Sequence, residues 1–155
     1  NPYGRAAGEN VTVNVLFEVD LEALKNRDYE TAFTYITNLT DPKYGEDRDV
    51  FFFPEKIMRN GKEQYALISR PVNPSEYSAF TETKPSIVIS YGDNFFDFAN
   101  DNVERELIAV PVFDWEKERV GASTPPVKLS DGTWLLNYHG KKDSEFGYTQ
   151  SFMIL

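Results

Sequence analysis

Hydrophobic and polar residues alternate near the start of the chain. Across residues 11–19 every second residue is valine or phenylalanine, and most residues between them are polar. This period of two predicts a half-buried β-strand. Residues 20–26 then have the character of a short helix, with Asp20 as its N-cap.

Further runs rich in β-branched and aromatic residues predict more strands. They cover residues 31–37, 86–91, 107–113 and 146–155. Pro111 confines the third of these runs to an edge, a bulge or a strand end, because proline cannot donate to a sheet ladder. The pattern therefore predicts an all-β chain.

Two predicted hairpins resemble each other. Asn60-Gly61 separates a run ending at residue 58 from residues 64–68, and Asp131-Gly132 separates residues 127–129 from residues 133–138. Asn-Gly is the strongest short hairpin signal, since both residues tolerate the positive φ of a type I′ turn. Repeated hairpins favour a β-propeller over a sandwich, although two unrelated hairpins in a sandwich would look similar.

Composition and charge limit the class of protein. The 155 residues are 41% hydrophobic and 15% aromatic, which suffices for one ordinary core. A net charge of −9 argues against a nucleic-acid partner, which needs clustered Lys and Arg. No apolar run approaches the roughly 20 residues that span a bilayer, so we expect a soluble chain with no membrane partner. The compartment stays open.

The chain has few residues that could bind a metal ion. The chain has no cysteine and one histidine, His139, so thiolate sites and all-histidine zinc sites are excluded within it. Asp93, Asp97 and Asp101 lie four residues apart, which matches no calcium-loop pattern. We expect no metal and no organic cofactor.

Four motifs occur in order along the chain. Residues 49–57 read DVFFFPEKI, and residues 69–71 read SRP. Residues 120–126 read VGASTPP, and residues 131–140 read DGTWLLNYHG. Together they resemble glycoside hydrolase family 130, the β-mannoside phosphorylases and β-mannosidases. In that family an Asp and an apolar run precede Phe-Pro-Glu-Lys, a strand ends in His-Arg-Pro, and a Gly-x-x-x-Pro-Pro segment precedes Gly-Trp-Leu-Leu-x-Tyr-His-Gly.

The resemblance implies an all-β fold, a β-propeller that is five-bladed in the family. At typical repeat lengths about three blades would fit in this chain. We therefore expect residues 1–155 to be part of a single propeller catalytic domain. The motif match covers residues 49–155, and residues 1–48 are placed only loosely. The family's general acid, an Asp on an early blade, is expected to lie outside this chain.

The resemblance also implies a phosphate site. Phosphorolytic members contact phosphate through a Lys and a His at the positions of Arg48 and Ser69. Arg48 keeps the positive charge and can bind an oxyanion with its planar fork, whereas Ser69 cannot. This difference favours hydrolysis slightly over phosphorolysis, with inorganic phosphate as a possible co-substrate.

Other site residues are expected at the ends of the two hairpins. Arg70, Tyr138, His139 and Asp143 are candidate sugar ligands, and Glu55 is a candidate base for activating water in an inverting mechanism. Each has an ordinary structural alternative, namely a surface arginine, a core tyrosine, a packed histidine, a loop charge and a carboxylate that binds turn amides.

The leading hypothesis is an enzyme that cleaves β-mannosidic linkages in oligosaccharides by inversion, with water or phosphate as nucleophile. The alternative is a noncatalytic or truncated carbohydrate-binding propeller. The expected partner is an oligosaccharide, and self-association could cover open sheet edges.

Overall fold

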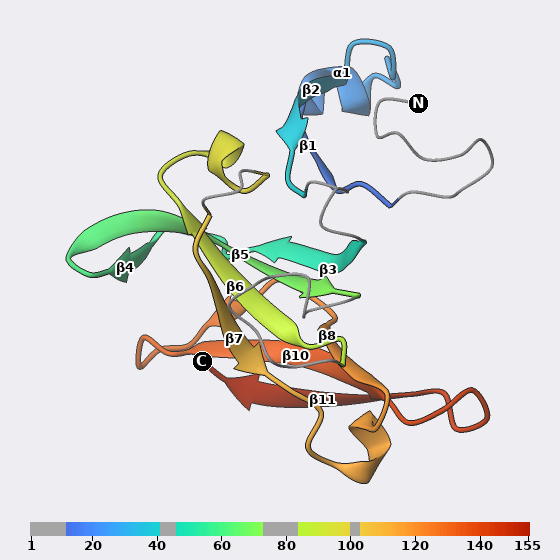
Figure 1. Ribbon diagram of the computed structural model, residues 1–155. Helices are drawn as coiled ribbons and strands as arrows, with labels where there is room; N and C mark the ends of the chain where they lie inside the picture. The colour runs from blue at the N-terminus through green and yellow to red at the C-terminus, as the bar shows by residue number, and fades with distance from the viewer. Residues whose placement is uncertain (1–11, 41–45, 73–83, 100–102) are drawn as a thin grey trace.

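The computed structural model describes residues 12–40, 46–72, 84–99 and 103–155. Within these ranges the fold is three antiparallel sheets with one short α-helix, α1, and two single-turn 3₁₀ segments, η3 and η4 (Figure 1). The predicted all-β class is therefore confirmed. In the same ranges, no helix has both the length and the apolar character to cross a membrane.

The first hairpin forms a two-stranded sheet of its own. β1 (Val15–Val19) pairs with β2 (Phe33–Asn38), and α1 (Leu21–Lys25) lies between them. Asp20 caps the helix, because its Oδ1 accepts hydrogen bonds from the backbone N–H groups of Glu22 and Ala23 at 2.9 and 3.0 Å. The predicted helix and its cap are confirmed.

The second sheet has the strand order β3-β5-β6-β7, with β4 paired to the free part of β5. Its strands are β3 (Asp47–Phe52), β4 (Ile57–Arg59), β5 (Lys62–Pro71), β6 (Ile87–Gly92) and β7 (Arg105–Ala109). The 3₁₀ segment η3 (Phe95–Asp97) follows β6. As predicted, the strand before Pro111 lies at an edge, and it ends at Ala109.

The third sheet has the order β11-β10-β8, with β9 paired to the start of β10. After η4 (Asp114–Glu116), its strands are β8 (Arg119–Ala122), β9 (Val127–Lys128), β10 (Trp134–Lys141) and β11 (Tyr148–Ile154).

Both predicted hairpins form, with different turns. Asn60 and Gly61 have φ of 52° and 78°, the two positive values of a type I′ turn. In the other hairpin only Gly132 is left-handed, with φ of 91°, and Gly132 N–H bonds Leu129 O at 3.1 Å. This is a three-residue loop, in which a turn is followed by a left-handed glycine. In Figure 1 both turns lie on the left, so β5 and β10 both run toward the right of the molecule.

The main core lies between the second and third sheets. Ala66, Ile68 and Ile89 pack from one sheet against Val120 and Leu136 from the other. A smaller cluster of Leu39, Leu67 and Phe98 covers the opposite face of the second sheet, and Leu16 packs against it. Alternate residues of β5 therefore pack into the main core and into the smaller cluster.

The predicted buried face of the first strand is wrong. Val15, Phe17 and Val19 are 41%, 45% and 39% exposed, whereas Leu16 packs inward. Alternation identifies a strand, but it cannot say which face meets the core when both faces carry hydrophobic residues. Residue 11, the start of the predicted strand, lies outside the described residues.

Candidate functional site

The ends of β5 and β10 meet at one carboxylate. Arg70 Nε donates a hydrogen bond to Asp49 Oδ2 at 2.5 Å, and His139 Nε2 lies 3.5 Å from the same oxygen. Arg70 is buried, with 6% of its surface exposed, while Asp49 and His139 are partly exposed. The two residues expected at the hairpin ends are thus brought together, and we refer to Asp49, Arg70 and His139 as the Asp49 cluster.

Asp49 reaches this position because β3 contains a bulge. Arg48 pairs with Arg70 and Phe51 pairs with Ile68, so two residues of β3 lie opposite one residue of β5. Asp49 is the bulged residue, with a left-handed φ of 54°. Aspartate is among the residues that adopt this conformation most readily, and bulges redirect side chains.

Gly121 provides the space in which the cluster meets. It lies directly opposite His139 in the ladder between β8 and β10. A Cβ atom at this position would overlap Asp49 Oδ2 and lie 2.8 Å from Arg70 Nε. The absence of a side chain therefore lets the carboxylate approach the imidazole.

The other nitrogen of His139 is held by a short chain of hydrogen bonds. Ser123 Oγ lies 3.0 Å from His139 Nδ1 and donates to Gln150 Oε1 at 2.8 Å. This contact turns the other ring nitrogen, Nε2, toward Asp49.

The charge state of His139 reflects opposing effects. Burial and the nearby charges of Arg70 and Arg119 lower the pKa of His139, while the Asp49 carboxylate raises it, and the net shift is downward. The imidazole is therefore neutral at neutral pH.

Three arginines border this end of the sheets. Arg48 lies opposite Arg70 and forms an ion pair with Glu46 at 2.6 Å while half-exposed. Arg119 Nη2 donates to Tyr148 Oη at 2.5 Å, and its buried Nε has no hydrogen-bond partner among the described residues. Arg48 and Arg70 are already paired with Glu46 and Asp49, so within the described ranges Arg119 supplies the uncompensated positive charge among these three arginines, which suits an anionic ligand.

Glu55 is not brought to the cluster. Its carboxylate forms an ion pair with Lys128, which lies opposite Trp134 at the hairpin end of β10. His139 is five residues further along β10, about 16 Å away at the usual strand rise.

Tyr138 and Asp143 also have other roles. Tyr138 points into the main core, on the opposite face of β10 from His139, and donates its hydroxyl proton to the buried Glu116 at 2.8 Å. Burial raises the pKa of Tyr138. Asp143 Oδ1 accepts from Phe146 N–H at 2.7 Å, so this residue organises the turn before β11. Their positions give no support to the predicted sugar-binding roles, which stay predictions.

Ser69 faces away from the cluster. It is buried beside Asp47, on the side of β5 that carries Leu67 and the smaller hydrophobic cluster. The pKa of Asp47 is raised to about 6, chiefly by burial.

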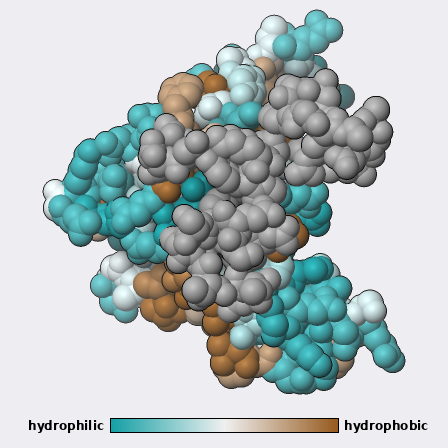
Figure 2. Space-filling view, viewed as in Figure 1, coloured by the Kyte–Doolittle hydropathy of each residue, from teal (hydrophilic) through white to brown (hydrophobic). Residues whose placement is uncertain are grey.

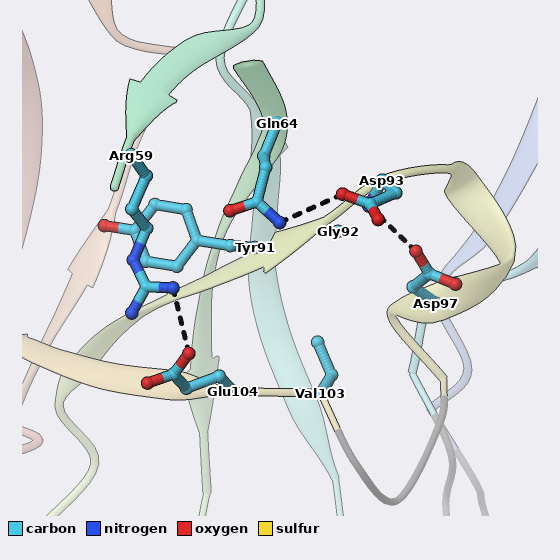
Figure 3. Close-up of a pocket in the computed structure, with 8 residues that line it drawn as sticks. All are labelled: Arg59, Gln64, Tyr91, Gly92, Asp93, Asp97, Val103 and Glu104. Atoms are coloured by element: carbon cyan, nitrogen blue, oxygen red, sulfur yellow. Dashed lines mark hydrogen bonds and ion pairs between the residues drawn. The ribbon is translucent and has the colours of Figure 1, made fainter. Parts of the chain in front are cut away.

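A hollow of about 270 Å³ lies near the hairpin end of the second sheet (Figure 3). Arg59 lies over the ring of Tyr91, 4.2 Å from its centroid, and pairs with Glu104 at 2.9 Å. Asp97 accepts hydrogen bonds from the backbone of residues 93 and 94. The charged groups of this hollow are already engaged in ion pairs or backbone hydrogen bonds, so we assign it no ligand-binding role. Among the described residues, no three His, Asp or Glu side chains are grouped to hold a metal ion.

Sequence reasoning named Arg70 and His139 but assigned no role to Asp49, Gly121 or Ser123. A signal was present for all three. Asp49 begins the DVFFFPEKI motif, and Gly121 and Ser123 lie in the VGASTPP motif. The bulge in β3 and the register between β8 and β10 bring these residues together, and neither could be derived from the spacing of residues along the sequence.

Comparisons with known proteins point to one class of enzyme. No protein-family model matches the chain. It is 33% identical over 109 residues to a β-1,4-mannooligosaccharide phosphorylase from Ruminococcus albus, covering 68% of this chain and 28% of that protein. It is also 33% identical over 98 residues to a 1,2-β-oligomannan phosphorylase from a Thermoanaerobacter species, covering 63% of this chain and 26% of that protein.

A solved structure agrees with these relatives. The β-1,2-mannobiose phosphorylase from Listeria innocua, in complex with β-1,2-mannobiose, superposes with a TM-score of 0.56 and 27% identity, covering 81% of this chain and 30% of that one. The chain thus spans less than a third of the length of these relatives. The comparisons confirm the resemblance seen in the motifs: this all-β chain is a relative of the propeller-type β-mannoside phosphorylases of glycoside hydrolase family 130.

Proposed function

We propose that this chain forms one wall of the active site of an enzyme that cleaves β-mannosidic linkages in oligosaccharides with phosphate as the nucleophile. The observation that carries the proposal is the convergence of Arg70 and His139 on Asp49 where β5 and β10 end. Arginine, imidazole and carboxylate side chains provide the donors and acceptors that sugar hydroxyls and phosphate oxygens require.

Each member of the cluster has a role in this proposal. A guanidinium has five N–H donors, and the Nε–H of Arg70 is the one that Asp49 accepts. The remaining donors can hold phosphate, with Arg48 and Arg119 adding positive charge nearby. His139 can form a hydrogen bond with a sugar hydroxyl through Nε2.

The proposed reaction is an inverting phosphorolysis. A phosphate oxygen attacks the anomeric carbon of mannose, and the glycosidic C–O bond breaks. The leaving oxygen takes a proton from a carboxylic acid that we expect outside this chain. The products are mannose 1-phosphate and an oligosaccharide shortened by one residue.

Phosphate is preferred over water for two reasons. The relatives are named as phosphorylases. In addition, Ser69, whose lack of positive charge favours hydrolysis, lies on the face of β5 away from Arg70. Hydrolysis is the second candidate, since Ser69 still replaces a basic residue of the phosphorolytic members. Glu55 would act as a base only in that case, and its ion pair with Lys128 gives this role no support.

The test uses the full-length protein that carries this chain, with β-1,4- and β-1,2-linked mannooligosaccharides in the presence and absence of phosphate. We expect mannose 1-phosphate to form only with phosphate. Arg70→Lys keeps the charge but loses the planar fork, so kcat/KM should fall at least about tenfold. Asp93→Asn, at an exposed ion pair with Lys62, is the matched control and should retain activity.

Other outcomes would overturn the proposal in different ways. Release of free mannose without phosphate would establish hydrolysis instead. Saturable sugar binding without turnover would favour the noncatalytic carbohydrate-binding alternative.

A further inference from the structure

We propose that Asp49 is a positioning residue that fixes Arg70 and His139 relative to each other, and that Gly121 is required for it to do so. This inference rests on the proposed function, because it concerns how the same site is held in shape.

The first observation is that a single oxygen atom serves two ligand-binding groups. Asp49 Oδ2 accepts from Arg70 Nε at 2.5 Å and lies 3.5 Å from His139 Nε2. Arg70 and His139 belong to different sheets, and no other direct link between their side chains is described. The carboxylate therefore connects the side chain at the end of β5 to the side chain at the end of β10.

A second observation is that the backbone adopts an uncommon conformation to place this carboxylate. A left-handed residue other than glycine costs roughly 1 kcal/mol, less for aspartate, and β3 accepts it at the bulge. Without the bulge, the strict alternation of β3 would be kept and residue 49 would point to the opposite face.

The third observation is the gap at Gly121. Gly121 lies opposite His139, and a Cβ atom there would occupy the place of Asp49 Oδ2. The atoms it would meet are Asp49 Oδ2 and the Nε and Cδ atoms of Arg70, all of them side-chain atoms. Gly121→Ala should therefore displace the carboxylate from the imidazole and shift the Arg70 side chain.

Asp49 should affect catalysis through the geometry in which the two substrates are held. A phosphate and a mannose unit must be held in one geometry, and displacement of a binding group by about 1 Å can cost roughly 100-fold in rate. Asp49 acts through Arg70 and His139 without contacting the reacting atoms. Its loss should therefore weaken phosphate binding through a disordered Arg70 fork.

Two variants test this by different routes. Asp49→Asn keeps an oxygen acceptor but removes the charge, and Gly121→Ala keeps every charged group but displaces the carboxylate. We expect both to raise the KM for phosphate at least about tenfold, with a smaller change in the KM for the oligosaccharide. Asp93→Asn should leave both KM values within about twofold of wild type, as expected for an exposed ion pair.

A second readout does not depend on activity. His139 is the one histidine of residues 1–155, and its imidazole resonances in the full-length protein can be identified by their loss in His139→Gln. The Asp49 carboxylate raises the pKa of His139. An NMR titration should therefore give a lower pKa for His139 in Asp49→Asn and in Gly121→Ala than in wild type, and an unchanged pKa in Asp93→Asn.

The two readouts separate the possible failures. If wild-type protein does not turn over mannooligosaccharides, the proposed function fails, and the His139 titration still decides whether Asp49 is held beside the imidazole. An unchanged pKa of His139 in folded Gly121→Ala, or an unchanged phosphate KM in an active Gly121→Ala, would overturn the positioning role. If Asp49→Asn does not fold, Gly121→Ala decides alone.

Discussion

Asp47 and Asp49 lie two positions apart on β3 and have different surroundings. Asp47 is 3% exposed, and its Oδ1 has no hydrogen-bond partner among the described residues. Asp49 is partly exposed and paired with Arg70. The bulge between them is what sends the two carboxylates into different environments. The Asp47 carboxylate is buried with one oxygen unpaired in the described part of the chain, although Ser69 and the backbone of Arg48 hydrogen-bond it, whereas Asp49 organises a site.

Asp47→Asn should stabilise the protein at neutral pH. Burial raises the pKa of Asp47 from 3.8 to about 6, so the folded state binds this proton more tightly than the unfolded state. The corresponding stability is fully present below pH 3.8 and is lost as pH rises through about 6, with roughly 3 kcal/mol as the upper limit.

The measurement is urea unfolding of wild type and Asp47→Asn at several pH values from 4 to 7. The free energy of unfolding of Asp47→Asn should exceed that of wild type by an amount that increases with pH across this range. Asp93→Asn, whose carboxylate is exposed, should show no such growth. If the free energy of unfolding depended on pH in the same way in wild type and Asp47→Asn, the raised pKa of Asp47 would be contradicted.

For single residues, the sequence predicted those at the ends of strands but not the residues whose side-chain direction depends on the register between strands. Arg70 and His139 could be named because each follows a recognisable hairpin, and the structure brings them together. Tyr138 differs from His139 by one position, and that step moves it from the cluster face of β10 into the core. A shift of one residue along a strand moves a side chain to the opposite face of the sheet, and sequence spacing alone cannot determine which face a residue lies on.

Among the elements, the hairpins were the most predictable. Asn60-Gly61 and Asp131-Gly132 carry local backbone requirements that hold in any fold, and both turns formed where expected. The face of β1 was not predictable, because it depends on how the β1–β2 hairpin meets the second sheet. Local chemistry therefore specified the turns, and packing between sheets specified which faces are buried.

Gly61→Ala tests the turn that sets the direction of β5. The φ of Gly61 is 78°, and a Cβ there would meet nothing within 4 Å, so the effect is one of backbone conformation alone. We expect a loss of about 1 kcal/mol in the free energy of unfolding. Gly61→Asn should lose less, since asparagine tolerates this region. Equal stability of Gly61→Ala and wild type in denaturant unfolding would contradict the turn assignment.

On the scale of the whole molecule, the described part of the chain exposes much apolar surface. Figure 2 shows hydrophobic side chains gathered over the lower part of one face, near β7 and the end of β11. Exposed hydrophobic residues of this region include Leu107, Val112, Phe113 and Ile154. Within the described ranges, β11 has a strand partner on one side only. These features fit sheets that pack against further sheets, as in a propeller. The number of blades and self-association stay predictions.

The central claim is that the ends of β5 and β10 form one ligand site. Its most direct test is the imidazole NMR spectrum of His139, recorded while inorganic phosphate and then β-mannobiose are added to the wild-type protein and to Arg70→Lys. We expect saturable shifts of the His139 resonances in wild type, and markedly weaker binding of phosphate in Arg70→Lys. Resonances that do not respond to either ligand, or that respond equally in both proteins, would contradict it.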